Sequence, residues 1–340
     1  MPCSRDRLRS RRFDCWRRCP GPTTCGNRAV RSDQVAELLD GAQRAERIGH
    51  HDAHELVGRV LHPRAGNAGP GFCGVDVISS SVLLRKIATA LLAVAILGYL
   101  GIATCLYLFQ DSLLYFPQHT RVAASQTDFA LPRGGGVVLR GWVINPGRPR
   151  ALLYFGGNGE PIQLLRPSLA RWFPTWTVYL VAYRGYGASS GSPSQANLFA
   201  DAVAIFDHVR ARHTSVAVIG RSLGTGVAVY LASRRPVTRV ALVTPYDSVA
   251  RVGQDEFPLF PVALLLHDKY DSMRYAGAVR CPVLLIEAAN DELISVAHSE
   301  RLARAFPRAP RILRIAGAGH NTVQNSPLYA ETLEAYFSAV

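Results

Sequence analysis

A serine, an aspartate and a histidine in the C-terminal half of the chain have the residue types and the order needed for nucleophilic catalysis. Ser222 stands in residues 220–224 (GRSLG), a G-x-S-x-G pattern between an apolar run and a segment of helical spacing. A serine hydroxyl needs a base to accept its proton, and the base needs a carboxylate to orient it. Asp291 follows the apolar run PVLLIE and His320 follows RILRIA. The sequence therefore predicts a triad of Ser222, His320 and Asp291.

Acyl transfer also needs hydrogen-bond donors for the oxyanion, where negative charge develops. The backbone N–H of Leu223 is expected to be one donor, because it opens a helix whose N-terminal dipole favours negative charge. The second donor is assigned to Gly157, with Asn158 as the alternative, in the Gly-rich loop after ALLYF. The alternatives without a catalytic role are a turn for this loop, a helix cap for Asp291 and a loop histidine for His320.

Several other side chains near these motifs have competing interpretations. Asp247 follows the preceding strand and is a rival acid, whereas Asp268 and Asp271 lie in the cap and are expected to be structural. Arg184 has the chemistry to bind a carboxylate or phosphate, but it is expected to fix its own loop. Cys281 precedes an apolar run, which predicts a buried, inert thiol.

Short apolar runs alternate with helical patterns through residues 111–340, which predicts a parallel sheet buried on both faces. The first strand alternates like an exposed edge strand. The apolar segment 257–270 is expected to be a lid helix in a cap at about 253–275; it could also line an acyl-binding cleft or touch a membrane. Strands are expected at 137–144, 151–155, 176–183, 216–220, 239–244, 282–287 and 311–316, and helices at 161–172, 194–211, 223–234, 296–306 and 326–338.

Residues 87–109 contain neither charge nor proline and predict a transmembrane helix. At about 1.5 Å per residue they cover roughly 34 Å, which is enough to span a bilayer core of about 30 Å. A buried core helix or a cleaved signal peptide would fit this pattern less well. Arg85 and Lys86 precede the span and Asp111 follows it, so the globular C-terminal domain is expected on the extracytoplasmic side of a single-pass membrane protein.

Residues 1–80 are Arg-rich and lack a sustained apolar period, so this segment is expected to be disordered apart from a short helix at about 33–48. A metal site formed by its cysteines and histidines (Cys15, Cys19, Cys25, His50, His51, His54) is the competing interpretation, but the spacing matches no common zinc pattern. A further hypothesis is that translation starts downstream, which detection of peptides from residues 1–70 would refute. The net charge of +13 is spread along the chain, so no nucleic-acid partner is expected.

Residues 110–338 resemble a known family of membrane-anchored serine hydrolases with the α/β-hydrolase fold, a branch that includes protein depalmitoylases. The resemblance rests on SLLYFP, YFGGNGE, AYRGYGASSGSPS, GRSLGTGVA, KYDS, EAANDELI and AGHN. It implies a mostly parallel central sheet with helices on both faces and a small cap, and the same three catalytic residues. Relatives commonly have His-Gly where this chain has Phe155-Gly156, a change that should reshape the pocket rather than abolish activity.

The resulting prediction is a hydrolase of carboxylic ester or thioester bonds that forms an acyl-enzyme and needs neither a metal nor an organic cofactor. Its expected partners are an acyl substrate and the membrane, and the sequence does not indicate an oligomeric state. The alternatives are a non-catalytic, membrane-tethered binding protein on the same fold and a serine peptidase. Peptidases with this fold usually carry a further large domain, for which the chain has no matching segment.

Overall fold

The structure is a computed structural model, and it describes residues 77–338. The chain divides into two units, Met1–Asp76 and Val77–Val340. The short helix at about 33–48 and the proposed cysteine and histidine ligands lie outside the described residues, as does most of the segment 1–80.

The first described element is the long helix α2, Val77–Leu114, which contains the apolar run 87–109. It is long and apolar enough to cross a membrane, and no other helix among residues 77–338 meets that criterion. Its leucine, isoleucine and valine side chains are largely exposed along the span, for example Leu97 and Leu108. The run 87–109 within this helix is uncharged, and apolar side chains left uncovered along it need an apolar environment to cover them.

A central sheet of eight strands follows α2, in the order β1-β2-β4-β3-β5-β6-β7-β8. All pairings from β4 through β8 are parallel, while β1 and β2 are antiparallel to their neighbours. Because strands β3 to β7 are buried along their length on both faces, they read as continuous apolar runs in the sequence. The strands are β1 Phe129–Pro132, β2 Val138–Ile144, β3 Arg150–Phe155, β4 Trp176–Val181, β5 Ser215–Arg221, β6 Val240–Val243, β7 Val283–Ala288 and β8 Arg311–Ile315.

The expectation of an edge strand at 137–144 is wrong. Strand β2 pairs with β4 on one side and with β1 on the other. The edge is formed instead by β1, a four-residue strand that ends at Pro132. Proline cannot donate to a ladder, so it is tolerated at an edge and makes such a short strand hard to recognise from its sequence.

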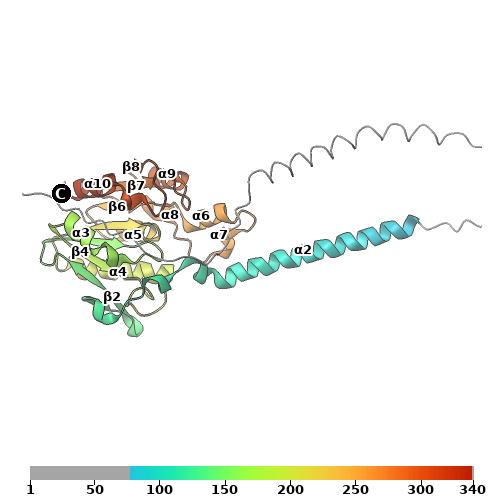
Figure 1. Ribbon diagram of the computed structural model, residues 1–340, viewed down its shortest axis with the longest axis horizontal. Coiled ribbons are helices and arrows are strands. Elements are labelled where there is room, and N and C mark those ends of the chain that lie inside the picture. The colour runs from blue at the N-terminus through green and yellow to red at the C-terminus, as the bar shows by residue number, and fades with distance from the viewer. Residues whose placement is uncertain (1–76, 339–340) are drawn as a thin grey trace, which may run out of the picture. The chain divides into compact units, whose positions relative to one another are not determined.

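Helices cover both faces of the sheet, as expected for an α/β hydrolase fold (Figure 1). The predicted apolar stripe of α4 is buried and packs into the core, with Leu198, Ala202 and Val209 each 1% exposed or less. Together with α2 the helices are α3 Arg166–Trp172, α4 Gln195–Arg210, α5 Leu223–Arg234, α6 Val249–Glu256, α7 Val262–Leu265, α8 Ser272–Ala276, α9 Val296–Ala305 and α10 Pro327–Ser338. Short 3-10 turns lie at Pro117–Thr120, Ala124–Gln126, Gly134–Gly136, Ile162–Leu165 and Val323–Asn325.

The segment between β6 and β7 forms a cap of three short helices, α6, α7 and α8, rather than one lid helix over 257–270. Only Val262–Leu265 is helical within the apolar segment. Pro258 and Pro261 lack the N–H that a continuous helix needs, so they divide the segment into short pieces. The cap places its apolar side chains near the carboxyl ends of the strands, where sites of this fold class form.

Candidate active site

Ser222 occupies a tight turn between β5 and α5. Its backbone has φ 48° and ψ −116°, a region that residues other than glycine seldom adopt. The turn is possible because glycines flank the serine. A Cβ at Gly220 would clash with the Gly224 carbonyl, and a Cβ at Gly224 would clash with the Phe155 carbonyl. Such strain persists only where the surrounding packing enforces it, and it raises the serine hydroxyl above the sheet.

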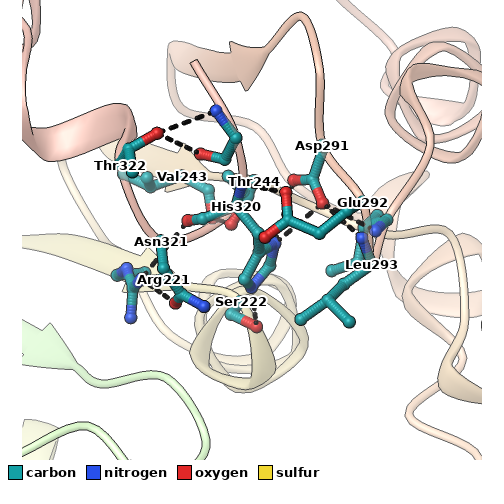
Figure 2. Close-up of polar contacts among 12 residues, drawn as sticks. Arg221, Ser222, Val243, Thr244, Asp291, Glu292, Leu293, His320, Asn321 and Thr322 are labelled. Carbon is teal, nitrogen blue, oxygen red and sulfur yellow. Dashed lines mark hydrogen bonds and ion pairs between the residues drawn. The ribbon is translucent and has the colours of Figure 1, made fainter. Parts of the chain in front are cut away.

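His320 and Asp291 meet Ser222 at the carboxyl edge of the sheet. His320 Nε2 lies 2.9 Å from Ser222 Oγ, and His320 Nδ1 lies 2.9 Å from Asp291 Oδ2 and 3.0 Å from Oδ1. Figure 2 shows the three side chains in one line of contacts. The His320 and Asp291 side chains are 4% and 2% exposed, so water competes little for these hydrogen bonds.

The loops that carry Asp291 and His320 hold each other in place. Asp291 Oδ1 accepts the backbone N–H groups of Leu293 and Ile294 at 3.0 and 2.7 Å, which fixes the carboxylate. Glu292 Oε2 accepts the His320 N–H at 2.9 Å, and this hydrogen bond lowers the pKa of the Glu292 carboxyl below its ordinary value. The base and its acid are therefore oriented by the backbone as well as by each other.

The competing acids have other partners. Asp247 is fully buried and accepts from His298 Nδ1 at 2.8 Å and from Arg301 Nε at 2.6 Å. Asp268 accepts from the Tyr115 hydroxyl, and Asp271 caps α8. These contacts leave Asp291 as the carboxylate within hydrogen-bond distance of the His320 ring.

The loop after β3 departs from the predicted donor. The Gly157 N–H donates to Glu160 Oε2 at 2.7 Å, so Gly157 does not present a free donor beside Ser222. The next N–H, that of Asn158, makes no hydrogen bond to any residue that the structure describes, and the same holds for the Leu223 N–H. Asn158 and Leu223 line the cavity at Ser222, whereas Gly157 borders a separate small pocket.

The sequence did not predict a buried ion pair next to the site, between Arg221 and Glu160. Arg221 Nη1 lies 3.4 Å from Glu160 Oε1, and the two side chains are 8% and 10% exposed. Arg221 Nη2 also donates to Asn321 Oδ1 at 3.0 Å and to the His320 carbonyl at 3.4 Å. Burial acts to lower the pKa of Arg221, but the Glu160 carboxylate outweighs it and the pKa rises. One signal was visible in the sequence: Arg221 directly follows the apolar run 216–220, and Glu160 is the carboxylate in the Gly-rich loop after ALLYF.

The structure also shows the contacts of Arg184 and the environment of Cys281. Arg184 forms a bidentate pair with Asp201, in which Nε donates to Oδ2 at 2.6 Å and Nη2 donates to Oδ1 at 2.8 Å. This pair fixes the loop and occupies the guanidinium edge that would bind a substrate carboxylate or phosphate. Cys281 is half-buried, and burial raises the pKa of its thiol to about 11, as expected for an unreactive cysteine.

A cavity of about 540 Å³ opens at Ser222 and His320 and is lined mainly by apolar side chains. Its walls come from the cap, from the loop after β7 and from the last turns of α2. One end of the apolar cavity thus holds a nucleophile, a base and two free backbone N–H groups. Such a site can bind a carbonyl group that carries an apolar chain.

Comparison with known proteins places the chain in a family. The chain is 33% identical over 255 residues to Uncharacterized protein MT2364 of Mycobacterium tuberculosis, a match that covers 70% of this chain and 90% of that protein. It is 34% identical over 167 residues to alpha/beta hydrolase domain-containing protein 17C of Xenopus tropicalis, covering 47% of this chain and 52% of that protein. No family model matches the chain.

Solved structures show the same fold. Est1E of Butyrivibrio proteoclasticus, solved with ferulic acid bound, superposes with a TM-score of 0.51 at 14% identity, over 62% of this chain and 98% of that one. The esterase Pf2001 of Pyrococcus furiosus gives a TM-score of 0.50 at 18% identity, over 66% and 95%. The protein is an α/β hydrolase. Within that fold it belongs to the same family as the Mycobacterium protein, and over about half of its length it is similar to the Xenopus protein named for its α/β-hydrolase domain.

Proposed function

We propose that the chain is a serine hydrolase that cleaves a carboxylic ester or thioester bond of an acyl substrate through Ser222, His320 and Asp291. The observation that carries the proposal is the continuous line of contacts from the Asp291 carboxylate, through both ring nitrogens of His320, to Ser222 Oγ. This is the geometry of a nucleophile joined to a base, with the base joined to an orienting acid.

In the first half-reaction His320 Nε2 accepts the proton of Ser222 as Oγ attacks the carbonyl carbon. Asp291 accepts the Nδ1–H, which holds the required tautomer and stabilises the imidazolium. The imidazolium then gives its proton to the leaving alcohol or thiol, and the acyl group remains on Ser222. In the second half-reaction His320 deprotonates a water molecule, which attacks the acyl-enzyme and releases the carboxylic acid. These steps need neither a metal nor an organic cofactor.

The oxyanion of both tetrahedral intermediates is assigned to the N–H groups of Leu223 and Asn158. Asn158 replaces Gly157 in this role because the Gly157 N–H is engaged by Glu160. The Leu223 N–H begins helix α5, so the helix dipole adds to the stabilisation. Donors of this kind contribute about 3 kcal/mol each to the transition state.

Helix α2 is proposed to be a single-span membrane anchor, with the α/β-hydrolase domain (111–340) on the extracytoplasmic side and the cap at about 253–275 within it. The length and composition of α2 support the anchor, and Arg85 and Lys86 at its N-terminal side support the orientation. Protease treatment of intact right-side-out cells tests this topology. Digestion of the hydrolase domain from outside is expected, and protection until the membrane is opened would refute the orientation.

The catalytic proposal is tested by Ser222→Ala with Ser233→Ala as the matched control. Ser233 lies near the other end of α5 and donates only to the Tyr230 carbonyl of the same helix. Hydrolysis of p-nitrophenyl butyrate is expected to fall by about 10⁴-fold or more in Ser222→Ala, with an unchanged melting temperature, and to stay at the wild-type rate in Ser233→Ala. Retention of most of the activity in Ser222→Ala would refute the assignment.

A further inference from the structure

Two helices that lie far apart in the sequence, α2 and α6, each contribute one face to the lining of the apolar cavity at Ser222. Helix α2 contributes Leu106, Gln110, Leu113 and Leu114, which recur at the three- and four-residue steps of one helical face. Cap helix α6 contributes Val249, Val252, Gly253 and Glu256 with the same spacing. The groove therefore lies between a face of the proposed membrane anchor and a face of the cap.

The cap is attached to α2 well inside the apolar span. The rings of Tyr99 and Phe260 stack with 5.0 Å between centroids, and the Tyr99 hydroxyl donates to the Leu259 carbonyl at 3.0 Å. Nearer the end of the helix, the Gln110 amide donates to the Leu265 carbonyl at 3.2 Å and accepts the His267 N–H at 2.7 Å. These contacts satisfy the polar atoms between α2 and the cap and leave apolar side chains to line the groove.

The position of Tyr99 gives the depth of the cap beside the helix. Tyr99 precedes Leu114, the last residue of α2, by fifteen residues, which corresponds to about 22 Å of helix. If α2 spans a membrane, cap residues near Phe260 lie beside hydrocarbon rather than above the surface. The cap is suited to that environment, because Leu259 and Leu264 are 80% and 82% exposed. Exposed leucines at this depth would be covered by lipid chains.

The same end of α2 also holds the proposed oxyanion loop. Asn158 Nδ2 donates to the Leu114 carbonyl at 2.6 Å, and Asn158 Oδ1 accepts from the Phe116 N–H at 3.0 Å and the Tyr186 hydroxyl at 2.7 Å. The loop that presents the Asn158 N–H is thus tied to the last residue of the helix. The anchor therefore contacts both the chain-binding groove and the loop beside the nucleophile.

We propose that α2 is a wall of the substrate site, and that the acyl chain of a membrane-resident ester or thioester passes from the bilayer along α2 and the cap to Ser222. This inference rests on the proposed function and adds to it the route and the specificity element. The groove is lined by Phe260 and Leu265, which are the sequence neighbours of the exposed Leu259 and Leu264, so a long chain would pass from lipid to protein with little contact with water. A short acyl group gains little from this wall.

The test compares two tryptophan substitutions on α2. Leu106 lines the groove, whereas Leu108 is 65% exposed and does not line it. The two positions are two residues apart and face different sides of the helix. The measurement is kcat/KM of the full chain in phospholipid vesicles, with p-nitrophenyl dodecanoate and p-nitrophenyl butyrate as probes.

Leu106→Trp is expected to lower the dodecanoate-to-butyrate ratio of kcat/KM at least tenfold, because the added ring fills the groove. Leu108→Trp is expected to keep both rates. Leu113→Trp is a second groove variant at a position that is 55% exposed, so it tests the same wall with little risk to folding. An unchanged ratio in both groove variants would overturn the inference while leaving the serine hydrolase intact. If the wild type hydrolyses neither ester, the proposed function itself fails.

Two natural carriers present such a chain and differ in their leaving group: a monoacylglycerol and an S-acylated peptide. Both are offered at equal concentration in the same vesicles, and released fatty acid is measured. Entry along α2 is supported if the rate of fatty-acid release from either substrate falls in Leu106→Trp but not in Leu108→Trp. The substrate that the wild type hydrolyses faster identifies the carrier. No release from either, by an enzyme that hydrolyses p-nitrophenyl butyrate, would contradict a membrane-resident substrate.

Discussion

Arg221 and Glu160 form a buried pair, 3.4 Å between Nη1 and Oε1, directly below the nucleophile. Glu160 holds the Gly157 N–H in the loop after β3, and Arg221 holds Asn321 and the carbonyl of His320. The pair therefore connects the loop of the proposed oxyanion donor to the loop of the proposed base. Arg221 borders the cavity at Ser222, but its guanidinium is engaged by Glu160, by Asn321 and by the His320 carbonyl, so we assign both side chains a positioning role.

Glu160→Gln and Arg221→Lys are expected to lower kcat about 10- to 100-fold with a much smaller change in KM, because the donors and the base lose their alignment. Glu160→Gln removes one charge of the buried pair and destabilises the fold by about 3 kcal/mol. Arg221→Lys keeps the charge and loses the fixed donor geometry of the guanidinium. Activity should therefore be measured well below the melting temperature of each variant. Arg235→Lys is the matched control, since Arg235 pairs with Asp207 at the surface. A rise in KM with an unchanged kcat, or equal losses of kcat in the control, would contradict the positioning role.

The two candidate acids are separated by their asparagine variants. Asp291→Asn is expected to reduce kcat by about 10⁴-fold, because an amide can neither favour the correct His320 tautomer nor stabilise the imidazolium. Asp247→Asn is expected to keep kcat within a few-fold of wild type, since its partners are His298 and Arg301. Steady-state kinetics on butyrate ester measures both. The opposite pattern would make Asp247 the acid.

Asp247 is expected to make stability depend on acid pH. Burial acts to raise the pKa of this carboxyl, but hydrogen bonds from His298 and Arg301 outweigh it and the pKa falls below its ordinary 3.8. A carboxyl with a lowered folded-state pKa adds stability above the unfolded-state pKa and loses it as the pH falls through the folded-state value. The difference in unfolding free energy between wild type and Asp247→Asn should thus be constant from pH 7 to 5 and shrink below about pH 4. Urea denaturation across that range measures it, and a difference that grows on acidification would contradict the shift.

The fold was readable from the sequence where one physical signal dominates. The inner strands are uniformly apolar because both of their faces are buried, and α4 shows a clean stripe. The misses occur where that signal is weak. Strand β1 is short and ends in proline. Residues 257–266 of the cap are uniformly apolar, and this composition concealed the breaks that Pro258 and Pro261 impose.

The candidate site divides in the same way. Ser222 was found through its glycines, and Asp291 and His320 through their places after strands, because these depend on local backbone and topology. The choice between Gly157 and Asn158 depends on where Glu160 points, which is a side-chain contact with no periodic pattern. The proximity of α2 to the groove depends on packing between segments about 150 residues apart, which composition alone does not encode.

The most direct test of the central claim, that Ser222 is an activated nucleophile, is covalent labelling of the full chain with a fluorophosphonate followed by peptide mass spectrometry. Wild-type protein is expected to carry one label, on Ser222, and His320→Ala should label at least a hundredfold more slowly because the hydroxyl loses its base. Labelling at another serine, or equal rates with and without His320, would contradict the claim.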